Sequence, residues 1–307
     1  MKILFYCDAT EYSGIGHLIR CNNIAEYINN NTNAETAISG NIDINFIEEK
    51  GYGYIEIING FSFLDYDLIV FDSYNEDEYK KINSQNIKKI AIDDMEIFDY
   101  PNWELVINFR LKENYKHYKA KKVLTGLKYF PASKFFKDLR NNFEKKEQIR
   151  NLFFYFGETK EIEIDTKVVE FINIYKKSYN FFIKTALDNS NWTQINNKNY
   201  HDLFAKSDVI IHGGGFTKYE SAYSRKFNLS FSLTDLQKFD TEQLTKYNLV
   251  EDMGMFISFE DVLKNTVDFL ENKNLNEKVL SFQDSSNKCF EKDSLSRISK
   301  EIIKVIN

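Results

Sequence analysis

Short apolar segments recur along this chain, and segments with helical spacing of apolar residues lie between most of them. Segments typical of strands lie near residues 2–8, 67–72, 88–94, 104–109, 121–126, 150–157, 180–186, 207–215 and 229–233. Segments typical of amphipathic helices lie near 18–28, 161–176, 216–225, 237–247, 259–271 and 294–306. Strands that alternate with helices in this way are typical of parallel βαβ units. We therefore predict an α/β protein.

The length of the chain indicates two domains. Its 307 residues exceed the size at which one core keeps growing, so two domains of roughly 150 residues each are expected. The segment 133–149 is charged and has little apolar periodicity, which makes it the best candidate for a linker. We predict an N-terminal Rossmann-like domain over residues 1–140 and a C-terminal Rossmann-like domain over residues 141–307.

Composition excludes several classes of protein. No run of about 18 uncharged apolar residues could span a membrane, and the opening MKILFYCDAT is not typical of a signal peptide. Cys7, Cys21 and Cys289 have no CxxC spacing, which indicates reduced thiols and a cytoplasmic protein. The net charge of -6 disfavours a broad surface for nucleic acid. We expect a small-molecule ligand instead.

A glycine loop follows the first predicted strand. Gly14, Ile15 and Gly16 lie between that strand and the first predicted helix, directly before His17. Glycines let backbone amides approach a ligand closely, and the start of a helix favours negative charge. The loop is therefore a candidate site for a diphosphate or a sugar. Because the third glycine of GxGxxG is missing, we expect no nicotinamide cofactor.

His17 is the candidate general base, because an imidazole titrates near neutral pH. The alternative is a histidine that only caps or packs against the loop, and position alone does not separate the two. Asp8, at the end of the first strand, either orients the imidazole or caps a turn. Arg20, one helical turn after His17, either pairs with an acid or is solvated.

A second glycine turn lies in the segment HGGGFTKYE. Gly213, Gly214 and Gly215 join a predicted strand to a predicted helix that contains Glu220. Three consecutive glycines have a large entropic cost unless a tight turn or a close ligand requires them. We favour contact with a phosphate or nucleotide over a simple turn. Glu220 either accepts hydrogen bonds from ribose hydroxyls or is an ordinary surface glutamate.

No metal site is expected. Asp93 and Asp94 follow a predicted strand, but neighbouring histidines and further spaced carboxylates are missing, so a turn or a substrate contact is the better interpretation. His117, His201 and His212 lack the spacing of metal ligands, and we interpret them as surface or packing residues.

Taken together, these segments resemble the UDP-sugar hydrolases of pseudaminic acid biosynthesis and their spore-coat polysaccharide relatives. The resemblance covers nearly the whole chain. It rests on the order of several motifs: GxGHxxR (Gly14, Gly16, His17, Arg20), FDSYN (Asp72, Tyr74), IDDM (Asp93, Asp94), GLKYFPASKFF, FFYFGET (Gly157), HGGGFTKYE (Gly213 to Glu220) and Gln237.

This resemblance implies a GT-B fold, in which two Rossmann-like domains face a central cleft and the C-terminal half holds UDP. It implies a hydrolase that releases UDP from a UDP-diacetamido-trideoxy sugar by attack of water at C1, with no metal and no cofactor. The implied catalytic residues are His17, Tyr74 and Asp8. The implied substrate-binding residues are Gly14, Ile15, Gly16, Arg20, Asp72, Asp94 and Gly157. The implied nucleotide-binding residues are Gly213, Gly214, Gly215, Phe216, Thr217, Glu220 and Gln237.

The chain differs from the family pattern at a few positions. Tyr6 stands where the family commonly has a basic residue, Ser73 stands in place of a histidine, and Leu236 stands in place of an asparagine. Glu158 and Lys160 replace part of a Gly-Gly-Thr-Asp turn. Two alternatives therefore stay open: a GT-B glycosyltransferase in which His17 activates an acceptor hydroxyl, and a non-catalytic binder of a nucleotide sugar.

Overall fold

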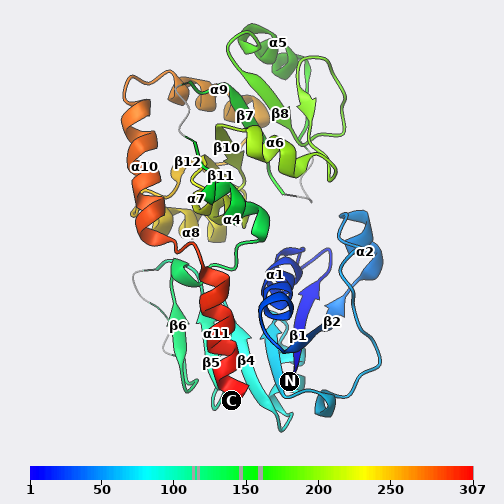
Figure 1. The fold of residues 1–307 in the computed structure, drawn as a ribbon. Coiled ribbons are helices and arrows are strands. Elements are labelled where there is room, and N and C mark those ends of the chain that lie inside the picture. The colour runs from blue at the N-terminus through cyan, green and yellow to red at the C-terminus, as the bar shows by residue number, and fades with distance from the viewer. Residues whose placement is uncertain (113–114, 116–117, 145–147, 158–161, 307) are drawn as a thin grey trace. The chain divides into compact units, whose positions relative to one another are not determined.

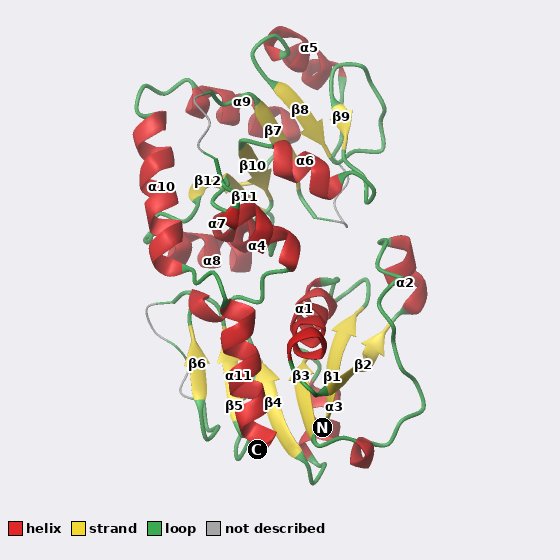
Figure 2. Ribbon diagram, viewed as in Figure 1, coloured by secondary structure: helices red, strands yellow, loops and turns green. Residues whose placement is uncertain are grey.

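The computed structural model describes residues 1–112, 115, 118–144, 148–157 and 162–306. The chain divides into two compact units (Figure 1). Unit 1 comprises Met1–Lys134 and Phe290–Asn307, and unit 2 comprises Phe135–Cys289. In both units, red helices separate many of the yellow strands along the chain (Figure 2), as the sequence predicts.

Unit 1 contains a six-stranded parallel sheet in the order β2-β1-β3-β4-β5-β6. Its strands are β1 (Lys2–Ala9), β2 (Glu35–Ile42), β3 (Leu68–Asp72), β4 (Lys88–Ile92), β5 (Leu105–Asn108) and β6 (Val123–Thr125). Its helices are α1 (Gly16–Asn31), α2 (Ile44–Glu49), α3 (Glu76–Asn83) and α11 (Ser294–Ile306), with short 3-10 turns at Phe63–Asp65 and Leu127–Tyr129. Every residue of β3 and β5 is buried, as expected for strands covered on both faces.

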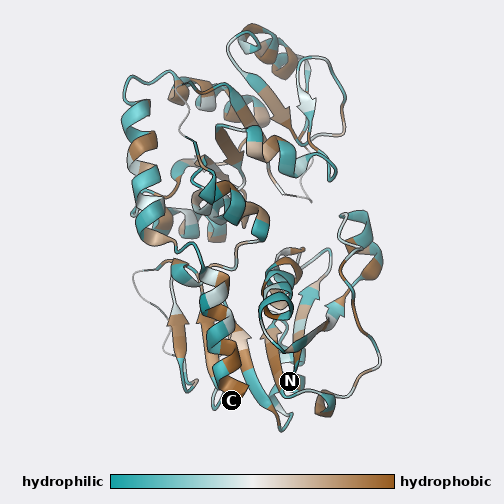
Figure 3. Ribbon diagram, viewed as in Figure 1, coloured by the Kyte–Doolittle hydropathy of each residue, from teal (hydrophilic) through white to brown (hydrophobic). Residues whose placement is uncertain are grey.

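Aromatic side chains fill much of the core of unit 1. Tyr100 and Trp103 are fully buried, and their rings lie 4.9 Å apart between centroids. Trp103 also packs edge-on against Phe71 of β3 at 5.8 Å. In Figure 3, β5 and β6 are coloured as hydrophobic, whereas α1 and α11 carry mixed colours. These aromatic residues are therefore part of the core of unit 1.

Unit 2 contains a second six-stranded parallel sheet, in the order β12-β11-β10-β7-β8-β9. Its strands are β7 (Asn151–Tyr155), β8 (Asn180–Ile183), β9 (Thr193–Gln194), β10 (Val209–His212), β11 (Phe227–Ser232) and β12 (Glu251–Met255). Its helices are α4 (Lys134–Asn141), α5 (Thr166–Tyr175), α6 (Tyr200–Lys206), α7 (Thr217–Tyr223), α8 (Asp235–Thr245), α9 (Phe259–Leu270) and α10 (Leu275–Cys289). Phe153 and Phe204 are fully buried and pack at 5.5 Å.

The division into units differs from the expected ranges at two places. The segment 133–149 is not only a linker, because its first part forms α4, whose buried Arg140 donates to the carbonyl oxygen of Tyr223 at 2.6 Å. The final helix α11 belongs to unit 1 rather than to the C-terminal half, and its Ile298 and Ile302 are fully buried there. An amphipathic pattern shows that a helix has an apolar face, but it does not show which core that face covers.

Each sheet has one topological switch point, where consecutive connections leave in opposite directions. In unit 1 it lies between β1 and β3, and in unit 2 between β7 and β10. Ligands of open parallel sheets bind beyond the carboxyl ends of the strands at such points. The loops after these four strands are therefore the places to look for chemistry.

Candidate functional site

The switch point of unit 1 carries a cluster of ionisable side chains. Asp8 lies near the end of β1, and His17 and Arg20 lie on α1, which the Gly14–Gly16 loop joins to β1. Asp72 is the last residue of β3, and Asp94 follows β4. The parallel sheet brings these residues together, although up to 74 positions separate them in the chain.

His17 is held by Asp72. The Nδ1 atom of His17 lies 2.7 Å from Oδ1 of Asp72, and the two side chains are 3% and 0% exposed. Arg20 binds the same carboxylate through Nε to Oδ2 and through Nη2 to Oδ1, both at 2.5 Å. Burial alone would raise the pKa of Asp72, but the charge of Arg20 and the hydrogen bonds that Arg20 and His17 donate hold this pKa below its ordinary value. Asp72 is therefore ionised at neutral pH.

The hydrogen bonds around Arg20 fix the tautomer of His17. Arg20 Nη2 also lies 2.9 Å from Nδ1 of His17. However, Nη2 has only two protons, and it donates them to Oδ1 of Asp72 at 2.5 Å and to Oδ1 of Asp94 at 3.1 Å, so none is left for His17. The Nδ1–H group of the imidazole therefore donates to Asp72. The lone pair lies on Nε2, which has no hydrogen-bond partner among the described residues.

Asp94 is surrounded by donors. Its Oδ1 accepts from Arg20 and from the Tyr74 hydroxyl at 2.6 Å, and its Oδ2 accepts from Arg110 Nε and Nη2 at 3.2 and 3.1 Å. Burial alone would raise the pKa of Asp94, but the two guanidinium groups hold it far below its ordinary value. Burial and Asp94 together raise the pKa of Tyr74 well above its usual range. Tyr74 is therefore a neutral donor.

Tyr74 lies beside the imidazole. Its ring meets the His17 ring edge-on, at 4.4 Å between centroids and 78° between planes. Tyr74 is 36% exposed, whereas His17, Arg20, Asp72 and Asp94 are buried. The family resemblance implies substrate binding for Arg20, Asp72 and Asp94. In the structure their polar groups bind one another, so they form the support of His17.

Asp8 does not orient the imidazole. Its Oδ2 accepts a hydrogen bond from the Ser73 hydroxyl at 2.5 Å, and the Ser73 hydroxyl in turn accepts from the backbone amide of Asn75 at 2.9 Å. The other carboxylate oxygen, Oδ1, is buried without a hydrogen-bond partner among the described residues. Burial raises the pKa of Asp8. The orienting contact comes from Asp72 instead.

The first glycine loop lies between β1 and α1, as predicted, and has empty space beside its glycines. Gly14 has a φ of 73°, and its amide donates to the carbonyl oxygen of Thr10 at 2.8 Å. No heavy atom lies within 4 Å of the positions that a Cβ would take at Gly14 or Gly16. Ile15, the half-buried N-cap of α1, makes no side-chain cap. The backbone of this loop is thus accessible to a ligand.

At the switch point of unit 2, the three glycines after β10 have different surroundings. A Cβ at Gly213 would lie 2.8 Å from Leu233 Cδ1, and Gly214 has a φ of 78° with Ser230 and Ser232 hydroxyls 3.1 Å from its Cβ position. Both therefore need to be glycine for packing. Gly215 is exposed and has nothing within 4 Å of its Cβ position. Only Gly215 leaves room for close approach of a ligand.

The Gly214 backbone is held by two buried side chains. Its amide donates to Nδ1 of His212 at 3.1 Å, and His212 Nε2 lies 3.0 Å from Oδ1 of Asn228. Burial lowers the pKa of His212 to about 4, so the ring is neutral and Nε2 carries the proton. The Gly214 carbonyl oxygen accepts from Lys218 Nζ at 2.7 Å. His212 is thus a packing residue, as expected.

Glu220 lies on α7 after this turn. The residue is only half-buried, but the surrounding protein still desolvates its carboxyl group and raises its pKa to about 8. This carboxyl group has no charge or hydrogen-bond partner among the described residues. It is a polar group without a structural partner, which is a property of ligand-binding side chains.

The other predicted nucleotide residues, and Gly157, which the resemblance assigns to substrate binding, lie at the same edge of the sheet. The carbonyl oxygen of the Gln237 side chain accepts from the Leu233 amide at 2.9 Å, so it fastens the turn after β11. Phe216 is the N-cap of α7, and Thr217 is its first residue. Gly157 follows β7 with a φ of 92° and open space at its Cβ position.

The positions that differ from the family pattern have varied surroundings. The Tyr6 hydroxyl donates to Glu78 and accepts from Lys81 Nζ at 2.7 Å. Ser73 holds Asp8, as described above. Leu236 is 52% exposed. Glu158, Lys160 and His117 lie outside the described residues.

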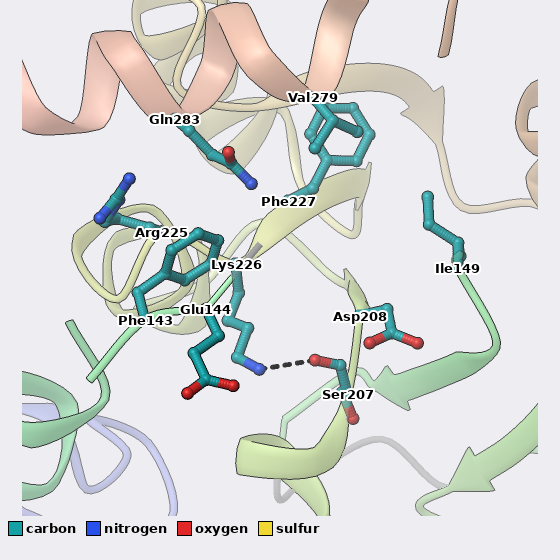
Figure 4. Close-up of a pocket in the computed structure, with 10 residues that line it drawn as sticks. All are labelled: Phe143, Glu144, Ile149, Ser207, Asp208, Arg225, Lys226, Phe227, Val279 and Gln283. Carbon is teal, nitrogen blue, oxygen red and sulfur yellow. Dashed lines mark hydrogen bonds between the residues drawn. The ribbon is translucent and has the colours of Figure 1, made fainter. Parts of the chain in front are cut away.

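A separate small pocket lies at the opposite edge of the unit 2 sheet. It is lined by residues that precede β10 and β11, including Asp208 and Arg225, together with Phe143 and residues of α10 (Figure 4). Arg225 lies over the Phe143 ring at 4.3 Å, and Lys226 Nζ donates to the carbonyl oxygens of Ala205 and Ser207, both at 2.7 Å. This pocket lies at the amino ends of the strands, so it is not part of the switch-point site.

Sequence reasoning missed several members of the site. Arg110, which binds Asp94, and the buried ion pair of Lys218 and Asp240 at 2.6 Å were not singled out. Arg110 follows β5, and the carboxyl end of that strand was the available signal. Within the described ranges, no group of three or more His, Cys, Asp or Glu could hold a metal ion. None of the described helices combines the length and apolarity that a membrane crossing needs.

The sequence matches no protein-family model and no curated protein. Solved structures are similar over nearly the whole chain. The UDP-GlcNAc 2-epimerase of Neisseria meningitidis bound to UDP-GlcNAc has a TM-score of 0.59 at 11% identity and covers 99% of this chain and 100% of its own. MurG of Acinetobacter baumannii has a TM-score of 0.61 at 12% identity, with coverage of 99% and 100%. A glycosyltransferase of Streptomyces sp. SF2575 complexed with thymidine diphosphate has a TM-score of 0.60 at 11% identity, with coverage of 98% and 99%.

At these identities the similarity establishes the fold. The two parallel six-stranded sheets with interleaved helices are those of the GT-B glycosyltransferase fold, which confirms the predicted fold class.

Proposed function

We propose that this protein is an enzyme that acts on a nucleotide sugar, and that it is a hydrolase. The solved structures with the same fold include an epimerase bound to UDP-GlcNAc and a glycosyltransferase complexed with thymidine diphosphate. The fold alone does not determine a reaction, so the assignment depends on the residues at the two switch points. The single observation that carries it is the His17 imidazole, which Asp72 fixes through Nδ1, while no described residue hydrogen-bonds to Nε2.

His17 is the general base. Its Nε2 lone pair takes a proton from a water molecule as the water oxygen bonds to C1 of the sugar. The bond between C1 and the phosphate oxygen breaks, and UDP leaves with the electron pair. The ionised Asp72 stabilises the imidazolium that forms, and Tyr74 beside the ring helps to position the substrate. The products are free sugar, UDP and one proton.

The burial of His17 favours water over a bulkier acceptor. The imidazole is 3% exposed and is flanked by the Tyr74 ring. A water molecule fits against a confined nitrogen more readily than the hydroxyl of a large acceptor does. We therefore place hydrolysis before glycosyl transfer. We assign the substrate to the UDP-diacetamido-trideoxy sugars of nonulosonic acid biosynthesis, on the order of motifs along the chain.

Unit 2 binds the nucleotide in this proposal. Gly215 offers an open backbone to the diphosphate, and Glu220 offers a carboxyl group without a structural partner to the ribose hydroxyls. Gly213 and Gly214 shape the turn, and Gln237 fastens the neighbouring turn. Phe216 and Thr217 continue the backbone past Gly215. Gly157, on the other side of the switch point, is assigned to the sugar part of the substrate in this proposal.

Incubation with a panel of UDP- and CMP-sugars, with and without acceptors, tests this function. We expect release of nucleotide and free sugar from a UDP-sugar without any acceptor, and release that is slower by roughly 100-fold or more for His17→Ala. Release that requires an acceptor would identify a glycosyltransferase instead. Binding without turnover on the whole panel would identify a non-catalytic binder.

A further inference from the structure

Lys218 makes an unusual contact for a lysine. It lies on α7 and is 1% exposed, and its Nζ donates to the backbone carbonyl oxygen of Gly214 at 2.7 Å. The same ammonium pairs with Asp240 Oδ2 at 2.6 Å. Asp240 is itself fixed by the Tyr219 hydroxyl, which lies 2.9 and 2.8 Å from its two oxygens. A buried charged pair of this kind is costly to desolvate and seldom needed for stability alone.

The contact determines which way one peptide group faces. The peptide between Gly214 and Gly215 is trans, as are all peptide bonds that the structure describes. In a trans peptide the C=O and N–H groups point in opposite directions. Because Lys218 holds the Gly214 C=O toward the interior of unit 2, the Gly215 N–H must point away from Lys218. Gly215 is exposed, and no described residue accepts from its amide.

The glycines on both sides of this peptide make the Lys218 contact necessary. Glycine adopts positive and negative φ with similar ease, so a peptide between two glycines can reverse at low cost. Reversal would turn the carbonyl oxygen outward, and that oxygen would repel a phosphate. The hydrogen bond from the Gly214 amide to His212 Nδ1 holds the preceding peptide, but it does not fix this one.

We propose that Lys218 is a positioning residue: it fixes the Gly214–Gly215 peptide with the Gly215 N–H outward, where this amide donates a hydrogen bond to a phosphate oxygen of the nucleotide. The inference rests on the proposed nucleotide binding by unit 2. It concerns only the Gly214–Gly215 peptide group and the Lys218 ammonium that donates to its carbonyl oxygen. A hydrogen bond from a backbone amide to a charged phosphate is among the stronger hydrogen bonds in proteins.

The test removes the buried pair as a whole, because Lys218→Met alone would leave the Asp240 charge buried without its partner. The double variant Lys218→Met, Asp240→Asn keeps an oxygen at position 240 for the Tyr219 hydroxyl. Dissociation constants for UDP and for uridine are measured by calorimetry on the full chain. We expect UDP affinity to fall roughly 10-fold or more, because the phosphate contact is lost. Uridine affinity should change less than about 2-fold, because uridine has no phosphate.

A matched control is Lys226→Met. Lys226 also donates to backbone carbonyl oxygens, those of Ala205 and Ser207, but at the opposite edge of the same sheet. It should leave the ratio of UDP to uridine affinity unchanged. Equal losses for UDP and uridine in the double variant, or no loss for either, would overturn the inference.

A crystal structure of the double variant separates this inference from the proposed function. We expect the Gly214–Gly215 peptide to be reversed or present in two orientations. A single unchanged orientation would refute the role of Lys218, whatever the ligand is. Failure of the unmodified protein to bind UDP would instead refute nucleotide binding by unit 2, and with it the phosphate contact.

Discussion

Nδ1 of His17 lies 2.7 Å from Oδ1 of Asp72, although 55 positions separate the two residues in the chain. The parallel pairing of β1 with β3 brings them together, because α1 starts just after β1 and Asp72 ends β3. Arg20 binds both oxygens of Asp72, so the carboxylate has no freedom to turn. The imidazole is therefore fixed in one tautomer before any substrate is bound.

His17→Ala tests the general base. Turnover of a UDP-sugar should fall by roughly 100-fold or more, because no other group replaces Nε2. The affinity for UDP should stay nearly unchanged, since the proposed nucleotide residues all lie in unit 2. Steady-state kinetics and calorimetry on the same preparation check both statements. Near-normal turnover would remove His17 from this role.

Arg20→Met tests the support of the imidazole through stability. The variant leaves the Asp72 and Asp94 carboxylates buried without Arg20, so the free energy of unfolding at pH 7 should fall by about 3–5 kcal/mol. Exposed Lys80, which pairs with Glu76 on the surface of α3, is the matched control. Lys80→Met should leave the free energy of unfolding almost unchanged.

The pH dependence of the Arg20 effect has a definite sign. Arg20 holds the pKa values of Asp72 and Asp94 below their unfolded values. The stability that this contributes is present above the unfolded pKa of about 4 and is lost as the pH falls below it. In urea unfolding experiments, the difference in the free energy of unfolding between the unmodified protein and Arg20→Met should become smaller below about pH 4. A difference that grows in acid would contradict the ion-pair network.

Glu220 should make nucleotide binding depend on pH. Burial raises the pKa of Glu220 to about 8, so this carboxyl group is mostly protonated at pH 7 when no ligand is bound. Ribose hydroxyls that donate to the carboxylate favour the ionised form, and UDP affinity should therefore rise from pH 7 to about pH 8 and then level off. The diphosphate stays ionised over this range. Calorimetry with Glu220→Gln should give a flat profile, and parallel profiles for both proteins would exclude Glu220 from the contact.

The glycine turn of unit 2 predicts different effects for neighbouring substitutions. Gly213→Ala places a Cβ 2.8 Å from Leu233, which should lower the free energy of unfolding by about 1–3 kcal/mol. Gly215→Ala meets no atom within 4 Å, so its melting temperature should be close to that of the unmodified protein. It should nevertheless weaken UDP binding, because the methyl group lies where the diphosphate approaches. Normal UDP binding by folded Gly215→Ala would place the nucleotide elsewhere.

The sequence predicted the fold because its strongest signals are local. Short apolar strands followed by helices define parallel sheets, and the glycine loops mark where the chain turns at their carboxyl ends. β2, β9 and β12 were not predicted, because β9 has only two residues and the sequences ETAISGNI of β2 and EDMGM of β12 are partly exposed and contain a glycine. The place of α11 in unit 1 was not predicted either, because it depends on contacts between residues far apart in the chain. For example, Lys88 at the start of β4 donates to the carbonyl oxygen of Val305, which is 217 positions away.

The candidate site was predicted only in part, because many of its contacts join residues that are far apart in the chain. His17 and the glycine turns stand out because their residue types are unusual beside a strand end, whereas Tyr74 was implied only by the family resemblance. The partners are decided by packing: Asp72 holds His17 in place of Asp8, and Arg110 joins Asp94. Likewise, Lys218 and Asp240 look like surface residues in the sequence, yet they form a buried pair behind the Gly214 turn.

The most direct test of the account is hydrolysis of a UDP-diacetamido-trideoxy sugar in water labelled with oxygen-18, followed by mass spectrometry of both products. If His17 activates water to attack C1, the label should appear in the free sugar and not in UDP. His17→Ala should give neither product at a comparable rate. Label in the phosphate of UDP, or no products unless an acceptor is added, would contradict the proposed reaction.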